Sequence, residues 1–116
     1  MAAVRRLALA VLASAALAAP AAAATPSQIL AATLKPVMQE QFKTKVKGLV
    51  FTKVTCFVPA KSKLVAGHCT AAFTVKRYRL NGVYKVIADI SAKGRLGWHT
   101  TGVSCTDSRT HKPLKC

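Results

Sequence analysis

The first 24 residues have the three-part pattern of an export signal, which leaves only about 92 residues to fold. A basic start without acids, Met1 to Arg6, is followed by an uninterrupted small and apolar stretch from Leu7 to Ala19. Pro20 ends that stretch, and four alanines then offer the small-x-small pattern that signal peptidase requires. A membrane anchor is the alternative, but the apolar run of 13 residues is shorter than the roughly 18 that a spanning helix needs. We therefore expect residues 1–24 to be removed and residues 25–116 to form one small secreted domain.

A domain of this size lies near the lower limit for a self-sufficient hydrophobic core, so it gains from covalent cross-links. All four cysteines lie in the remaining part: Cys56, Cys69, Cys105 and Cys116. An even number of cysteines in a small exported chain predicts two disulfides. Zinc is the competing interpretation because three histidines are present, but no cysteine pair has the C-x2-C or C-x4-C spacing of structural zinc sites. We expect neither a metal nor a cofactor.

The remaining domain is strongly basic. Two of the 18 lysines and arginines leave with the signal, so sixteen stand against three acids and the net charge is +13. A field of this size draws a protein to nucleic acid, phospholipid headgroups or phosphate-bearing wall polymers. The alternative is that the charge is spread over every face and only maintains solubility. The candidate anion-binding residues are Lys53, Lys76, Arg77, Arg79, Lys85, Lys93 and Arg95.

A helix is predicted from residue 25 to about residue 46. Thr25 can cap it, Pro26 suits the first helical position, and Gln28 completes a capping box. Apolar residues then recur at helical spacing along one face: Ile29, Leu30, Leu34, Val37, Met38 and Phe42. Pro36 interrupts the segment and predicts a kink near residues 32–35 or two short helices. We interpret the apolar face as facing the core, although partner-binding helices have the same pattern.

After Gly48 the apolar pattern changes from helical to alternating, which is typical of a strand. One side of this strand, which Pro59 ends, carries Val50, Val54, Cys56 and Val58. The opposite side carries Leu49, Phe51 and Phe57. This second side is either partly covered or exposed for a partner.

A second strand is predicted from His68 to Leu80, after a loop at residues 60–67. Asn81-Gly82 then predicts a two-residue type I′ hairpin, since both residues tolerate positive φ. The resulting register places Phe73 opposite Ile90, so apolar residues meet on one face. A turn at residues 93–95 leads to a fourth strand at residues 96–105.

These elements predict an α+β fold, with the helix packed on a four-stranded antiparallel meander at residues 48–105 and a tail at residues 106–116. Cys56 and Cys69 fall on the core face of adjacent strands, near the loop that connects them, and are the favoured pair. Cys105 and Cys116 then pair and hold the tail, which would otherwise fray. Each bridge contributes about 2–4 kcal/mol to stability.

Two cysteine-bearing segments follow the helix in an order that resembles a known family. The segments are VTCFVP from Val54 to Pro59 and AGHCTAAFTV from Ala66 to Val75, followed by Asn-Gly. Together they resemble small secreted actinobacterial domains of unknown function with a cystatin-like shape, over about residues 27–92. Pro59 stands three residues after Cys56 rather than directly behind it, and the second cysteine pair lies outside the family's pattern. The resemblance implies a fold and a compartment and no chemistry.

No catalytic set is recognisable in the sequence. Three scattered acids do not suggest the carboxylate pair of a glycosidase, and the pairing of all thiols disfavours a cysteine nucleophile. One ribonuclease-like arrangement is retained as an alternative. In it His68 and His99 act as acid and base and Lys76 stabilises charge on phosphorus.

The favoured hypothesis is a secreted, non-enzymatic domain held at an anionic cell-envelope polymer or membrane surface. A protein-binding module or inhibitor is the second hypothesis, with Leu49, Phe51, Phe57 and the loop at residues 60–67 as its contact. Nucleic acid is a less expected partner. Lys76-Arg77-Tyr78-Arg79 nevertheless places an aromatic ring among cations, as single-strand binders do.

Overall fold

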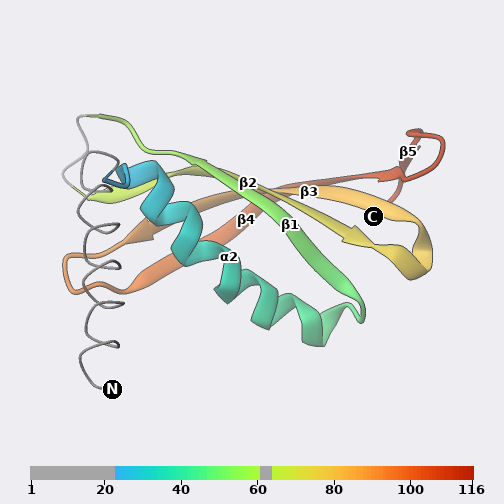
Figure 1. Ribbon diagram of the computed structural model, residues 1–116, viewed down its shortest axis with the longest axis horizontal. Helices are drawn as coiled ribbons and strands as arrows, with labels where there is room; N and C mark the ends of the chain where they lie inside the picture. The colour runs from blue at the N-terminus through green and yellow to red at the C-terminus, as the bar shows by residue number, and fades with distance from the viewer. Residues whose placement is uncertain (1–22, 61–63) are drawn as a thin grey trace, which may run out of the picture.

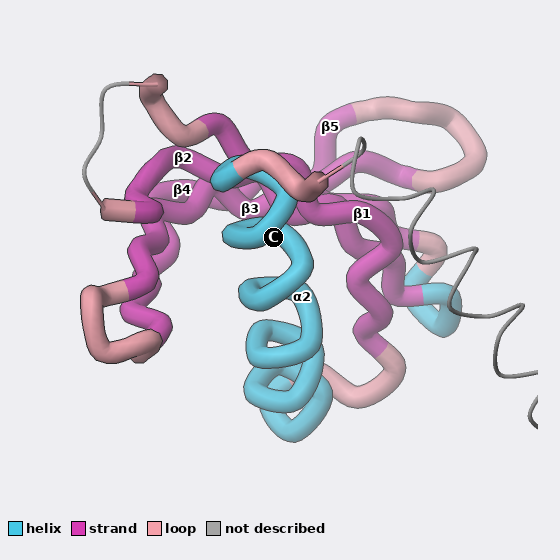
Figure 2. Tube along the Cα trace, turned by 60° about the vertical axis from the view of Figure 1, so that its left-hand side comes forward, coloured by secondary structure: helices cyan, strands magenta, loops and turns pink. Residues whose placement is uncertain are grey.

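The computed structural model describes residues 23–60 and 64–116, so the expected export signal lies almost entirely outside the described residues. The elements in chain order are α2 (Pro26–Lys45), β1 (Leu49–Phe57), β2 (Val65–Val75), the short 3-10 helix η2 (Lys76–Tyr78), β3 (Leu80–Ile90), β4 (Leu96–Asp107) and β5 (Pro113–Leu114). The strands form one antiparallel sheet in chain order, and α2 crosses one face of it (Figures 1 and 2). The α+β prediction is confirmed, with one more strand than expected. Among the described residues no helix is long and apolar enough to cross a membrane.

The helix begins with the predicted capping box. The Gln28 amide N–H donates to Thr25 Oγ1 at 3.2 Å, and the Thr25 amide N–H donates to Gln28 Oε1 at 2.9 Å. α2 then continues through Pro36 as one helix, so the alternative of two short helices is wrong. Pro36 is exposed, and on that side water can replace the hydrogen bond that proline cannot make.

One face of α2 packs on the sheet to form the core. Leu30, Leu34 and Met38, spaced four residues apart, are fully buried against the inner sides of β1, β2 and β3. Five rings complete the core toward the C-terminal end of the helix, with centroid separations of 4.8 to 6.2 Å: Phe42, Phe51, Phe73, Tyr84 and Trp98. The predicted core-facing role of the helix is confirmed.

β1 contains a β-bulge that changes which of its residues face the helix. Thr52 has no register partner in β2, so the inward positions are odd-numbered before it and even-numbered after it. Leu49 and Phe51 are buried, whereas Val50 is 52% exposed. The predicted faces of these three residues are therefore wrong, because one extra residue reverses the alternation. Phe57, which follows the bulge, is 68% exposed on the outer side as predicted.

β2 and β3 are joined by η2 and not by the predicted type I′ turn. β2 runs from Val65 to Val75, and β3 begins at Leu80, so Asn81 and Gly82 lie inside a strand. The reversal is made by η2 followed by Arg79 in the left-handed conformation, with φ of 50°. The Asn-Gly prediction fails because the chain has already turned before it reaches those residues.

The register between β2 and β3 differs from the predicted one by eight residues. Phe73 lies opposite Gly82 rather than Ile90. The Phe73 ring occupies the space that a side chain at Gly82 would need, which explains a glycine at this position. Because the shift is an even number, residues predicted as strand on either side of the turn, such as Phe73 and Ala88, keep their predicted faces.

β4 is longer than predicted and has a bulge of its own. Thr101 is the extra residue, and its hydroxyl donates to the Lys85 carbonyl at 3.4 Å. Beyond Asp107 the chain reverses and β5 pairs with Cys105 and Thr106, so part of the predicted irregular tail is a fifth strand.

Both predicted disulfides are confirmed. Cys56 bonds Cys69 across the β1–β2 pair, and Cys105 bonds Cys116 beyond β5. No free cysteine is present in the part of the chain that the structure describes. Two intramolecular disulfides indicate an oxidising, extracytoplasmic environment.

Candidate functional site

Most of the chain reversals lie at one end of the sheet. Leu49 pairs with Val75, Val75 with Leu80, and Leu80 with Asp107, so the start of β1, the end of β2, the start of β3 and the end of β4 form one row. The C-terminus of α2 leads directly into this row, and β5 returns to it. These segments gather toward the right of Figure 1.

This end of the molecule is strongly basic. We call the following eight residues the basic end: Lys45, Lys47, Lys76, Arg77, Arg79, Arg109, Lys112 and Lys115. Two come from the end of α2 and the residues just after it, and three come from the β2–β3 connection. The other three come from the β4–β5 connection and the residue that follows β5. All eight are exposed. Segments far apart in the sequence are therefore brought together by strand pairing into one positively charged surface.

The β2–β3 connection is held in a defined shape. The Arg79 amide N–H donates to the Lys76 carbonyl at 3.0 Å, and the Ser108 amide N–H donates to the Arg79 carbonyl at 2.8 Å. The second bond ties the β4–β5 connection to η2. Arg77 lies with its guanidinium 5.2 Å from the centre of the Tyr78 ring, which is 62% exposed. The backbones that carry the cations of these two connections are thus held next to one another.

Asp107 is the one acid of this end among residues 23–60 and 64–116, and its carboxylate is engaged internally. Asp107 Oδ1 accepts hydrogen bonds from the backbone N–H groups of Thr110 at 3.1 Å and Arg109 at 2.8 Å. These two bonds lower the pKa of Asp107 below its ordinary value, with smaller contributions from the Arg109 and Arg79 charges. The carboxylate therefore shapes the β4–β5 connection while the cations around it stay exposed to solvent.

A hollow of about 380 Å³ lies beside the basic end, on the outer side of β1 and β2. Lys76 and Arg77 form one wall, and Thr52 and Thr74 contribute hydroxyl groups. Gly48 supplies the positive φ of 87° that the chain needs between α2 and β1, next to Arg77. Hydroxyl donors beside two cations suit a phosphate or carboxylate group.

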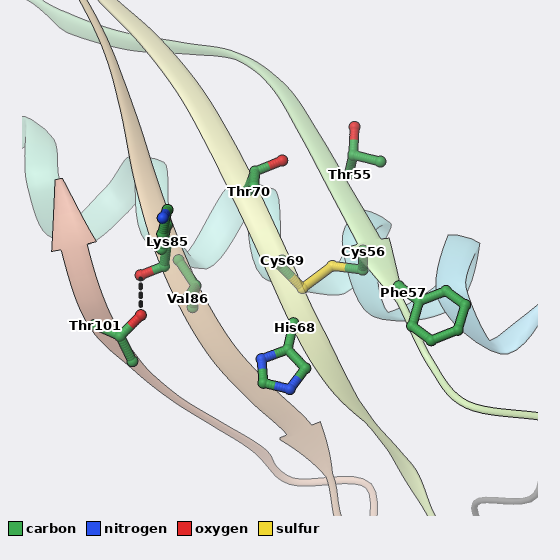
Figure 3. A pocket seen from close by; sticks show the side chains of 9 residues that line it. All are labelled: Thr55, Cys56, Phe57, His68, Cys69, Thr70, Lys85, Val86 and Thr101. Atoms are coloured by element: carbon green, nitrogen blue, oxygen red, sulfur yellow. Dashed lines mark hydrogen bonds between the residues drawn. A yellow bond between two sulfur atoms is a disulfide. The ribbon is translucent and has the colours of Figure 1, made fainter. Parts of the chain in front are cut away.

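A second hollow, of about 330 Å³, lies on the open face of the sheet above the Cys56–Cys69 disulfide (Figure 3). Its polar lining consists of His68, Lys85 and threonine hydroxyls, and Phe57 stands at its rim. His68 and His99 both lie directly opposite Ile87, on its two sides, so the two imidazoles share this face.

The ribonuclease-like set is not brought together. Lys76 is the first residue of η2, eight residues after His68 of β2, and eight residues of extended strand span about 26 Å. Lys85, and not Lys76, is the lysine that shares a hollow with His68. In the described part of the chain, no group of three His, Cys, Asp or Glu side chains is placed to hold a metal ion.

The predicted anion-binding residues divide into three groups. Lys76, Arg77 and Arg79 lie at the basic end. Lys53 and Lys85 lie on the open face, and Lys93 and Arg95 lie at the β3–β4 turn, which is at the other end of the sheet. The five further members of the basic end were missed because no local pattern connects them, although the run of three lysines at residues 43–47 before Gly48 was a usable signal.

The comparisons with known proteins leave the predicted family resemblance untested, because neither a family model, nor a curated protein, nor a solved structure matches this chain.

Proposed function

We propose that this domain is secreted and binds a polyanionic surface outside the cytoplasm through its basic end. The observation that carries the proposal is the convergence of eight exposed cations on one end of the sheet, where the one described acid is hydrogen-bonded to backbone. The disulfides support an oxidising compartment. In such a compartment the large anionic ligands are membrane headgroups and envelope polymers.

The shape of the basic end favours an extended polyanion over a small anion. The cations come from three separate segments and point into solvent, so they offer many weak contacts rather than one enclosed site. Each cation near an anionic surface contributes about 1 kcal/mol, and the attraction is screened within about 10 Å at 0.1 M salt. Binding of this kind requires multiple charges on the ligand and weakens as salt is added.

The test compares binding to vesicles of phosphatidylglycerol and of phosphatidylcholine over a salt titration. Lys47, Lys76 and Arg77 are replaced together by glutamine, and the matched control replaces Lys53, Lys85 and Lys93, which removes the same charge elsewhere. We expect the first variant to lose between about tenfold and 100-fold in affinity for the anionic vesicles. The control should lose less than about threefold. Equal losses in the two variants, or binding that does not change with salt, would contradict the proposal.

A further inference from the structure

The two edges of the sheet differ in how far their outward backbone groups are covered. At the β1 edge, side chains of α2 take the place of a missing strand. Gln39 donates from Nε2 to the Leu49 carbonyl at 2.9 Å and accepts at Oε1 from the Phe51 amide N–H at 2.8 Å. Near the other end of β1, Ser27 Oγ accepts from the Val58 amide N–H at 2.9 Å. The helix therefore closes this edge to any further strand.

The β4 edge is open over most of its length. β5 covers only Cys105 and Thr106, and in the described part of the chain no strand lies beside residues 96–103. Eight residues of antiparallel strand span about 27 Å. An exposed edge is a template for strand addition unless charge, proline or a β-bulge interrupts it. Residues 96–103 contain no proline, lysine, arginine or acid, and the bulge at Thr101 leaves residues 96–100 as the regular part of this edge.

The outward backbone groups of β4 can be assigned by alternation. At the turn into β4 the Ser91 amide N–H donates to the Arg95 carbonyl, so the backbone of Arg95 faces β3. Hydrogen-bonding direction alternates along an antiparallel strand, so the backbone groups of Leu96, Trp98 and Thr100 face outward. The bulge at Thr101 shifts this alternation by one residue, and at the far end of β4 the Asp107 amide N–H donates outward to the Lys112 carbonyl.

We propose that the open β4 edge binds an extended acidic peptide segment as an added strand. Strand addition supplies affinity through backbone hydrogen bonds and specificity through alternate side chains. Lys85 provides the specific feature: its Cδ is 3.9 Å from where a side chain at Gly102 would begin, so the Lys85 side chain lies over that glycine. Lys85 is exposed, so its ammonium is the cation available to a carboxylate on the added strand beside Gly102.

Charge favours an acidic segment over a second copy of this chain. The open stretch is flanked by Lys93 and Arg95 at one end and by the tail cations of the basic end at the other. Two copies paired antiparallel through β4 would place these two groups of cations side by side, in domains that each carry a net charge of +13. The Asp89 carboxylate lies over Gly97, as the Lys85 side chain lies over Gly102. Asp89 therefore disfavours a carboxylate on the added strand beside Gly97 only.

The test uses a synthetic peptide of about ten residues in which glutamate alternates with valine, with serine in place of the glutamate that would lie beside Gly97. Its control carries N-methyl groups on alternate backbone amides, which preserve the charge and remove one row of hydrogen bonds. With the first peptide we expect amide exchange at Leu96, Trp98 and Thr100 to slow by about tenfold or more. The N-methylated peptide should leave the exchange unchanged. Lys85→Glu should weaken binding of the glutamate peptide and favour a peptide with lysine in its place.

Three outcomes would overturn the proposal. The first is a response confined to the basic end, which would mean attraction by charge alone. The second is equal binding of both peptides. The third is protection of the β4 amides in the protein without peptide that increases with protein concentration, which would make a second copy the occupant.

Two variants separate this proposal from the proposed function. Thr100→Pro removes an outward N–H and no bond to β3, and Thr100→Ala is its control. We expect Thr100→Pro to weaken peptide binding at least about tenfold while binding to anionic vesicles is unchanged. If Thr100→Pro does not fold, the comparison of the two peptides on the unaltered protein still decides the matter.

Discussion

The Phe73 ring lies over the backbone of Gly82, its partner on the neighbouring strand, and fills the volume of the absent side chain. Gly82→Ala must therefore displace a buried ring, and we expect it to destabilise the domain by about 1–3 kcal/mol. Gly102→Ala is the matched control in the adjacent strand. Its added carbon would make an ordinary contact with Lys85 Cδ at 3.9 Å, so a change within about 0.5 kcal/mol is expected. Urea unfolding of both variants measures the difference.

Gln39 takes the place of a strand at the β1 edge, so its loss should cost stability. Gln39→Ala leaves the Leu49 carbonyl and the Phe51 amide without their part-buried partner, and we expect a loss of about 1–3 kcal/mol. Gln41→Ala, on the exposed side of the same helix, should change stability by less than about 0.5 kcal/mol. If the two variants unfold at the same urea concentration, the edge-closing role of Gln39 is wrong.

The Cys105–Cys116 disulfide holds the tail cations in place, so it should affect both stability and binding. It closes a loop with a sequence separation of 11, and replacing both cysteines by serine should destabilise the domain by about 2–3 kcal/mol. The segment that carries Arg109, Lys112 and Lys115 then depends on backbone hydrogen bonds such as that from Ser108 to Arg79, so it becomes more mobile and binding to phosphatidylglycerol vesicles should weaken. A variant that is less stable but binds as before would show that the fixed placement of these cations is unimportant.

The β4–β5 connection should depend on pH through Asp107. Hydrogen bonds from Thr110 and Arg109 lower the pKa of this carboxyl in the folded state. The stabilisation is therefore present above the ordinary pKa of an aspartate and is lost as the pH falls through the lowered, folded-state pKa. Amide exchange at Arg109 and Thr110 should speed up in that acidic range. Asp107→Asn keeps an acceptor oxygen without the charge, so in that variant this change should disappear.

The parts of the fold that depend on face and adjacency were predictable from sequence. Cys56 and Cys69 share a face of adjacent strands and lie near the loop that joins those strands, so their pairing could be predicted from alternation and adjacency. The core face of β2 and β3 survived an error of eight residues for the same reason, since an even shift preserves alternation.

The fold predictions were wrong where a tertiary contact outweighs a local sequence pattern. Asn81-Gly82 has the composition of a tight turn, but Gly82 is required by the Phe73 ring, a contact that no sequence window reveals. Val50 and Phe51 were placed on the wrong faces because a bulge leaves no mark in the alternation except an apparent excess of apolar residues on both sides. The basic end depends on three chain reversals meeting in one row, so it could not be recognised before the strand order was known.

The extra residue at Thr52 constrains the number of residues between Phe51 and Cys56. The inward-facing residues of the two halves of β1 have opposite parity. Phe51 in the first half and Cys56 in the second can face the helix together only because one residue between them has no register partner. Loss of that one residue would turn one of the two to the open face. If Phe51 turned, its contacts with the core rings would be lost, and if Cys56 turned, the disulfide could not form. Homologous chains should therefore keep an odd spacing between the last apolar residue before the bulge and this cysteine, and a chain with an even spacing should also lack the cysteine or the phenylalanine.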